Sequence, residues 1–299
     1  MPIGSLAFRS SYTRIDERLA MMSSLGVQRQ VLSLPGLFGI DSLPLDESAP
    51  LVRAFNDDLS QICREQPTRF AGLAALPLAD MDAALSELRR TRALPGFVGA
   101  IVPSNAFVDL VQASRWTPLF EEGNRLGCHF FVHPGRRPDQ VPDSSRMATE
   151  PKLGVLDSLP ERRALAVQAN LGEAMVTFQF TEFLDRYPDV TIHVANLGGT
   201  LPAVIERMDH TVLTRNPGAP LPSTRMRRIH VDCASLGPRT LELAVAIYGH
   251  DSIVLGTDCP IFLTDWTLGA VRDAKIEQSQ RDAILGGNAA RLLDRFGLS

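Results

Sequence analysis

Two segments of the sequence end in side chains that could carry chemistry. Residues 253–260 contain the apolar run Ile-Val-Leu, then Gly-Thr, and end in Asp258, Cys259 and Pro260. Residues 128–134 contain a second apolar run, which ends in His133 and Pro134. Such runs are typical of strands buried on both faces of a parallel sheet. A carboxylate and an imidazole at the ends of two such strands can bind a metal ion or transfer a proton.

The local sequence leaves two interpretations of Asp258 open. In a (β/α)8 barrel the carboxyl ends of the strands carry the active site, which favours a metal ligand or a proton-transferring acid. The alternative is an aspartate that caps a helix or forms a turn before Pro260.

Alternating helices and strands would position these side chains. Helical periodicity is expected at residues 16–25, 51–66, 80–92, 116–126, 164–186, 202–211, 240–248, 265–284 and 288–296. Strands are expected at residues 27–34, 70–78, 97–102, 128–133, 190–195, 229–233 and 253–258. This order predicts parallel strands joined by helical crossovers. Because residues 1–14 lack the apolar content of a buried strand, we predict an α/β fold, a TIM barrel whose first strand is missing or altered.

Finer features of these elements can also be predicted. Asp80 and Asn288 are placed to cap the helices that follow them, and Asn56 falls on the polar side of its helix. Residues 35–50 and 135–160 are rich in proline and polar residues, which indicates loops, the second of them over the barrel mouth.

Length, composition and charge bound the class of protein. A chain of 299 residues, 44% hydrophobic and 21% charged, can form one domain over residues 1–299, with an irregular segment at 1–15. A formal net charge of −4 without a basic run does not favour nucleic acid, and no apolar stretch is long enough to span a membrane. The chain start lacks the layout of a secretory signal, and four dispersed cysteines form no disulfide or zinc framework. We therefore expect a cytoplasmic protein with reduced thiols.

Several phrases occur in an order and spacing that resemble a known family. They are DERLAMM at 16–22, GVQ at 26–28 with VLS at 31–33, RFAGL at 69–73, VHP at 132–134, LGGTLP at 197–202, GTDCP at 256–260 and GNAARLL at 287–293. Together they are similar to amidohydrolase-related proteins of the 2-amino-3-carboxymuconate-6-semialdehyde decarboxylase type. The resemblance implies a metal-dependent barrel, nonoxidative decarboxylation as the usual chemistry, and hydratases and hydrolases as relatives.

Within this resemblance, His133 and Asp258 match two metal ligands of the family. The His-x-His pair that supplies two more ligands from the family's first strand has no counterpart in the sequence. Asn196 stands where the family has the histidine that activates a metal-bound water, and an amide cannot take up a proton near neutral pH. His193 lies three positions earlier, and strand alternation points it to the opposite side from Asn196.

Two arginines match positions that bind a substrate carboxylate in the family. Arg207 corresponds to an arginine that in some members reaches into the neighbouring subunit, and Arg9 loosely resembles a second one near the N-terminus. A guanidinium suits bidentate binding of a carboxylate. Ion pairing at the surface is the alternative for both arginines. The family also implies a homodimer.

The remaining candidates have structural explanations. His129, His210, His230 and His250 lie near the ends of predicted elements, where satisfied or solvated imidazoles are expected. Asp232 lies in a buried strand and could face the barrel interior or serve as a hydrogen-bonded structural acid. Without a motif histidine to activate it, Cys259 is expected to fill space rather than act as a nucleophile.

Three functions follow from these residues. The first is a carboxy-lyase acting on a small unsaturated or aromatic carboxylic acid, with zinc or manganese at His133 and Asp258 and a carboxylate held by Arg207. The second is hydrolysis or hydration by metal-bound water, against which Asn196 counts. The third is a degenerate barrel that only binds, because two protein ligands rarely hold a catalytic ion. A metal-free enzyme, in which Asp258 transfers the proton and His133 binds substrate, is also open.

Overall fold

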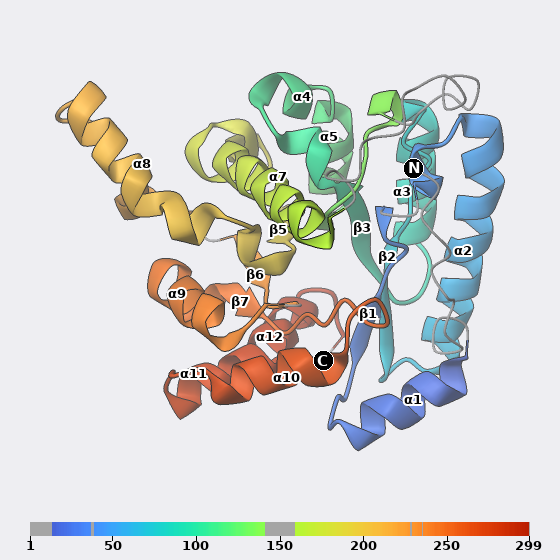
Figure 1. Cartoon of the computed structure of the whole chain (residues 1–299). Helices are drawn as coiled ribbons and strands as arrows, with labels where there is room; N and C mark the ends of the chain where they lie inside the picture. The colour runs from blue at the N-terminus through green and yellow to red at the C-terminus, as the bar shows by residue number, and fades with distance from the viewer. Residues whose placement is uncertain (1–13, 37–38, 141–158, 228, 235, 299) are drawn as a thin grey trace.

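A computed structural model describes residues 14–36, 39–140, 159–227, 229–234 and 236–298. The strands form one parallel sheet that follows the order of the sequence and curls, with helices on its outer side (Figure 1). They are β1 (Gln30–Leu32), β2 (Phe70–Ala74), β3 (Phe97–Pro103), β4 (His129–His133), β5 (Thr191–Val194), β6 (His230–Asp232) and β7 (Ile253–Val254). The seven predicted strands and their parallel order are confirmed, although each strand except β3 is shorter than predicted.

The two ends of this sheet are β1 and β7. Each is hydrogen-bonded to one neighbouring strand among the residues that the structure describes. The described strands therefore form a curled seven-stranded sheet. Residues 1–13, on which the prediction of a missing or altered first strand depends, lie outside the described residues.

Helices connect the strands. They are α1 (Ile15–Ser24), α2 (Leu45–Glu65), α3 (Met81–Arg92), α4 (Leu110–Ser114), α5 (Thr117–Arg125), α7 (Pro160–Phe180), α8 (Leu201–Arg215), α9 (Pro238–Tyr248), α10 (Thr264–Asp273), α11 (Gln278–Asp282) and α12 (Asn288–Asp294). The Asp80 side chain caps α3 by accepting a hydrogen bond from the backbone of Ala83, as predicted. No described helix is long and apolar enough to cross a membrane.

Three local predictions are wrong. The expected loop at 35–50 is partly helical, because α2 begins at Leu45 and contains Pro50 within its second turn, where the lost hydrogen bond interrupts little of the helix. Residues 265–284 are divided between α10 and α11 instead of forming one helix. Asn288 does not cap α12, because helical backbone already precedes it; its amide instead donates to the carbonyls of His250 and Ile253.

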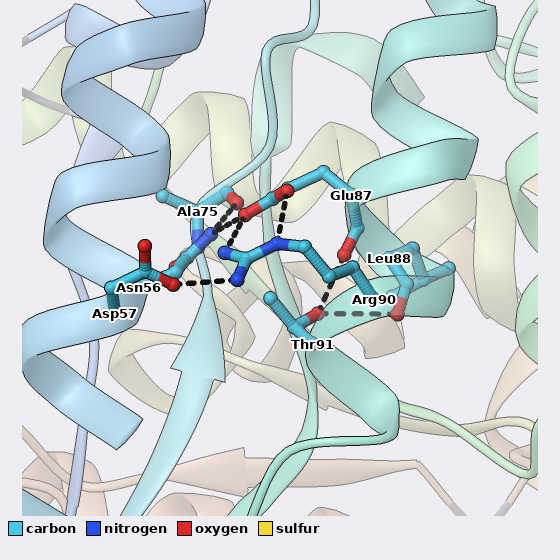
Figure 2. Close-up of polar contacts among 7 residues, drawn as sticks. All are labelled: Asn56, Asp57, Ala75, Glu87, Leu88, Arg90 and Thr91. Carbon is cyan, nitrogen blue, oxygen red and sulfur yellow. Dashed lines mark hydrogen bonds and ion pairs between the residues drawn. The ribbon is translucent and has the colours of Figure 1, made fainter. Parts of the chain in front are cut away.

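A buried polar cluster fastens α2 and α3 to the end of β2 (Figure 2). Asn56 was expected on the polar side of its helix but has no exposed surface. Its amide donates to the carbonyl of Ala75 at 2.9 Å and to Glu87 at 2.7 Å, and it accepts from the N–H of Ala75 at 3.0 Å. Arg90 then binds Glu87 through two hydrogen bonds and also pairs with Asp57. The amide is buried because it completes the backbone bonds of a strand end.

The two faces of β4 separate the hydrophobic core from the inner surface of the sheet. Phe130 packs against Phe120 of α5 with ring centroids 4.9 Å apart. Phe131 points to the other face, where its ring stacks on His193 at 4.2 Å. Period-two alternation therefore places His129, Phe131 and His133 together on the concave side.

Candidate active site

His133 and Asp258 meet at the carboxyl ends of their strands. His133 is the last residue of β4 and Asp258 follows β7, and the His133 Nε2 atom lies 3.7 Å from Asp258 Oδ1. His133 is buried, whereas 21% of the Asp258 side chain is exposed. The pair was predicted from the sequence, and the structure brings its two members together.

Asp258 also forms a turn. Its backbone has a φ of 49°, and its carbonyl accepts hydrogen bonds from the N–H groups of Ile261 and Phe262. The next helix, α10, begins at Thr264 with Leu263 before it, so Asp258 is not a helix cap. The turn interpretation of Asp258 is therefore confirmed, and its carboxylate lies beside the imidazole of His133; its role as a metal ligand or proton-transferring acid stays a prediction.

This pair fits two positions around a divalent cation. Imidazole nitrogen and carboxylate oxygen are both common ligands, and two atoms each about 2.1 Å from one ion lie roughly 3 to 4 Å apart. The separation of 3.7 Å falls in that interval. Within the described ranges, no three His, Cys, Asp or Glu side chains are grouped to hold a metal ion. All six histidines lie in those ranges, so this absence extends to every imidazole of the sequence.

Asn196 begins a tight turn between β5 and α8. Asn196 and Leu197 both have a φ of 53°, and Gly198 and Gly199 follow at 67° and 66°. A Cβ atom on Gly199 would lie 2.1 Å from the carbonyl oxygen of Gln168 in α7. The glycines therefore allow the turn to pack closely against α7. Asn196 itself is 8% exposed, and its amide side chain can hydrogen-bond but cannot act as a base.

Asp232 joins His193 to the backbone of Asn196, which strand alternation alone did not predict. Its carboxylate accepts from His193 Nε2 at 2.8 Å, from the N–H of Asn196 at 3.2 Å and from the N–H of Ala234 at 2.9 Å. Only 2% of Asp232 is exposed. Although burial opposes ionisation, the hydrogen bond from His193 and the two N–H groups lower the pKa of Asp232. The sequence left open whether Asp232 faces the interior or serves as a hydrogen-bonded structural acid. In the structure it faces the inner surface of the sheet, and its carboxylate is also hydrogen-bonded.

Asp41 is a buried acid at the same end of the sheet that the sequence analysis missed. It lies in a short helical turn after β1, and its carbonyl accepts from the N–H of Leu78 beyond β2. Its Oδ1 atom is buried without a hydrogen-bond partner in the described chain. Burial raises the pKa of Asp41 to about 6, while hydrogen bonds from the backbone of Asp41 and from Ser42, and to a lesser extent the nearby His133, oppose that rise. Asp41 lies in a polar, proline-rich segment of the sequence, and the neighbouring residue types gave no indication that its side chain is buried.

Of the two candidate arginines, the structure describes only Arg207. Arg9 lies outside the described residues. Arg207 is exposed on α8, which begins at the turn after β5 and extends away from the sheet (Figure 1). Its role in binding a carboxylate remains a prediction, and its exposed position suits contact with a second subunit.

The other histidines and the cysteines have structural surroundings. His129 is buried against the Thr191 hydroxyl at 2.9 Å, and burial together with His193 holds the pKa of His129 well below its ordinary value. His210 is exposed on α8, and His250 lies 3.5 Å from Asp251. All four cysteines are free; Cys259 is half-buried, and burial raises the pKa values of Cys63, Cys128 and Cys233 to about 11 or 12.

In proteins with (β/α)8-type folds the functional site lies at the carboxyl ends of the parallel strands, which is where His133 and Asp258 meet in this chain. The chain belongs to the amidohydrolase family, whose family model matches residues 7–295.

Its relatives include decarboxylases. The chain is 28% identical over 288 residues to 2-amino-3-carboxymuconate-6-semialdehyde decarboxylase of Dictyostelium discoideum, covering 93% of this chain and 76% of that protein. It is 29% identical to gamma-resorcylate decarboxylase of Rhodococcus jostii, covering 94% and 88%. A dihydroxybenzoic acid decarboxylase from Polaromonas, solved with manganese and 2-nitroresorcinol, shares the fold with a TM-score of 0.72, 24% identity and coverage of 93% and 85%. These relatives are carboxy-lyases of the family.

Proposed function

We propose that this protein is a nonoxidative decarboxylase of a small aromatic or unsaturated carboxylic acid. The observation that carries the proposal is the His133–Asp258 pair at the open end of the sheet, 3.7 Å apart, in a chain similar to decarboxylases over most of its length. We place the site in an amidohydrolase-type barrel that lacks the family's first-strand ligands.

The reaction requires a proton and a stable place for negative charge. As the bond between the carboxylate carbon and the substrate breaks, carbon dioxide leaves and the electron pair remains on the substrate carbon. In a metal-free enzyme, Asp258 would deliver a proton to that carbon and His133 would hydrogen-bond the substrate. Asn196 adds an amide for a neutral oxygen or hydroxyl.

A divalent zinc or manganese ion would be held by His133 and Asp258. When bound, it would supply positive charge that stabilises the negative charge left by carbon dioxide. With two protein ligands, the affinity should be far below that of a site with four.

Arg207 is proposed to bind a substrate carboxylate across a homodimer. Its exposed position on the projecting helix α8 supports contact with a neighbouring copy rather than with its own site. A guanidinium on that helix could then complete the partner's site.

Hydrolysis or hydration is less favoured, because Asn196 cannot serve as the base that water activation needs. A binding protein without turnover is the remaining alternative, favoured by the small number of metal ligands.

The test is release of carbon dioxide from gamma-resorcylate and related hydroxybenzoates by the purified chain. We expect turnover, and a fall of roughly 100-fold or more in His133→Ala and Asp258→Ala. His250→Ala, at a histidine beside Asp251 in the turn that precedes β7, at the opposite end of that strand from Asp258, should retain activity. Binding of 2-nitroresorcinol without turnover of any acid would instead favour the binding protein.

A further inference from the structure

The turn from Asn196 to Gly199 is strained and must be held by its neighbours. Its residues have positive φ values throughout, which glycine adopts freely but which asparagine and especially leucine do not favour. Such a turn persists only where surrounding contacts determine it.

Three contacts hold this turn and the residue after it. The Asp232 carboxylate accepts from the N–H of Asn196 at 3.2 Å, and the Tyr248 hydroxyl donates to the carbonyl of Leu197 at 3.2 Å. The N–H of Thr200 donates to the carbonyl of Gln168 at 3.0 Å. Of these three anchors, Asp232 alone carries a charged group, and it binds at the residue where the left-handed backbone begins.

The Asp232 side chain packs against the chain that follows β7, and both of its carboxylate oxygens accept hydrogen bonds. A Cβ atom on Gly256 would lie 2.6 Å from the Cβ of Asp232, so the strand that leads to Asp258 packs directly against this acid. The N–H of Ala234 occupies one carboxylate oxygen and His193 occupies the other. A change in Asp232 would therefore be transmitted both to the Asn196 turn and to the end of β7.

The ring of His193 is aligned for this contact. It stacks on Phe131 at 4.2 Å with an angle of 12° between the ring planes, and on His129 at 5.7 Å with an angle of 21°. These two rings fix the plane of the imidazole, and its Nε2 atom lies 2.8 Å from Asp232 Oδ2. Phe131 also lies edge-on to His133 at 5.2 Å, so one aromatic ring separates His193 from the candidate catalytic histidine.

We propose that His193 is a positioning residue of the active site: by holding Asp232, it fixes the strained turn that places Asn196 and the start of α8 next to His133. The backbone joins the residues that precede this turn and His133, since the N–H of Ala195, just before Asn196, donates to the carbonyl of Val132, just before His133, at 3.0 Å. Because Phe131 lies between the two imidazoles, His193 acts through Asp232 and does not replace the missing base at position 196. This inference deepens the proposed decarboxylase function and rests on it.

Two substitutions separate the hydrogen bond from the ring stacking. His193→Gln keeps an N–H donor near Asp232 and loses the ring, whereas His193→Phe keeps a ring between Phe131 and His129 and loses the donor. We expect kcat to fall about 100-fold in His193→Phe, the loss typical of misplaced site groups, and less than about 10-fold in His193→Gln. KM should change much less than kcat, since the substrate contacts remain.

Amide hydrogen exchange gives a readout that does not depend on turnover. In wild type, the N–H groups of Asn196 and Ala234 should be protected; His193→Phe should expose both, and His193→Gln should protect them. Equal loss of kcat and of protection in the two variants would overturn the proposal, because stacking would then be the cause. Retained kcat and protection in His193→Phe would overturn it as well.

A second variant covers the case in which His193→Phe does not fold. Asp232→Asn preserves shape but removes the charge, and its single amide oxygen can accept from His193 or from the two N–H groups but not from both. It should lose kcat and the protection of Asn196 while its melting temperature stays near that of His193→Gln; wild-type kcat and protection in Asp232→Asn would refute the role of the carboxylate. If no tested acid is decarboxylated by wild type but the exchange pattern holds, the decarboxylase proposal fails and the positioning contact stands.

Discussion

Burial changes the chemistry of single residues at the open end of the sheet. Asp41 and Asp232 are both almost fully buried, at 5% and 2% exposure, yet their pKa values move in opposite directions. Desolvation dominates for Asp41, whose Oδ1 atom has no partner in the described chain. For Asp232, an imidazole and two backbone N–H groups outweigh desolvation. The strength of the hydrogen bonds to the carboxylate, rather than depth, therefore decides the direction of the pKa shift.

We predict that Asp41→Asn stabilises the protein in a pH-dependent way. The folded pKa of about 6 lies above the unfolded value of 3.8, so the folded protein binds this proton more tightly than the unfolded chain does. Stability associated with Asp41 is therefore present below pH 3.8 and is lost as pH rises through 6. Replacing the acid by a neutral amide should raise the free energy of unfolding by on the order of 3 kcal/mol above pH 6, and by little near pH 4.

Urea denaturation of both proteins between pH 4 and pH 7.5 measures this difference. Asp189→Asn, at an exposed aspartate, is the matched control and should show no such pH-dependent gain. A gain in Asp41→Asn that is the same at every pH would contradict the assignment of the buried acid.

At the scale of elements, polar side chains fasten helices to strand ends. Asn56 binds both backbone groups of Ala75, just after β2, and Tyr248 of α9 binds the turn after β5. Each contact lies near the end of a strand, where the sheet's own hydrogen bonds stop. Side chains of helices thus hydrogen-bond backbone groups that lie beyond the ends of the short strands and have no partner in the sheet.

We predict that Asn56→Leu destabilises the fold by about 2 to 4 kcal/mol. Leucine is similar in size, but its substitution leaves the N–H and carbonyl of Ala75 and the carboxylate of Glu87 without this partner inside the protein. The measurement is the free energy of unfolding in urea. Gln61→Leu, on an exposed position of the same helix, should change that free energy by less than about 0.5 kcal/mol, and a similar loss in both variants would argue against the cluster.

For the whole molecule, the described residues bring together two candidate ligands for a metal, His133 and Asp258, without a third grouped beside them. We predict that the 299-residue chain retains well below one equivalent of zinc or manganese after dialysis, because His133 and Asp258 are joined by no third grouped ligand in the described residues. Elemental analysis of the purified protein is the measurement, with His133→Ala as the comparison. Near-stoichiometric, tightly bound metal that disappears in His133→Ala would show that further ligands complete the site.

The projecting helix α8 leads to a prediction about assembly. It carries Arg207 and exposes 56% of Leu213, which is typical of a helix that contacts a partner. We predict a homodimer in sedimentation velocity, and a shift toward monomer in Leu213→Asp. Exposed Leu243 of α9 offers the control, since Leu243→Asp should leave the dimer intact. A wild-type monomer at working concentration would remove the proposed role of Arg207 in a neighbouring site.

The sequence by itself determined the strands and the His133–Asp258 pair. A run of apolar residues long enough for a buried strand carries its signal locally, and so does the polar residue that ends it. Parallel strands bring their carboxyl ends to one edge, so two separate runs were sufficient to predict that His133 and Asp258 would meet.

Only the tertiary structure decided which other polar groups are buried and what they bind. His193 and Asp232 lie 39 residues apart, and Asn56 and Glu87 lie 31 apart. No local periodicity relates such residues, because their distance is set by how neighbouring strands register and how helices pack on them. Asn56 was placed on a polar face for the same reason: an amide has the same local pattern whether it binds water or the end of a strand. The charge of Asp41 and the turn at Asn196 likewise depend on neighbours that the fold brings together.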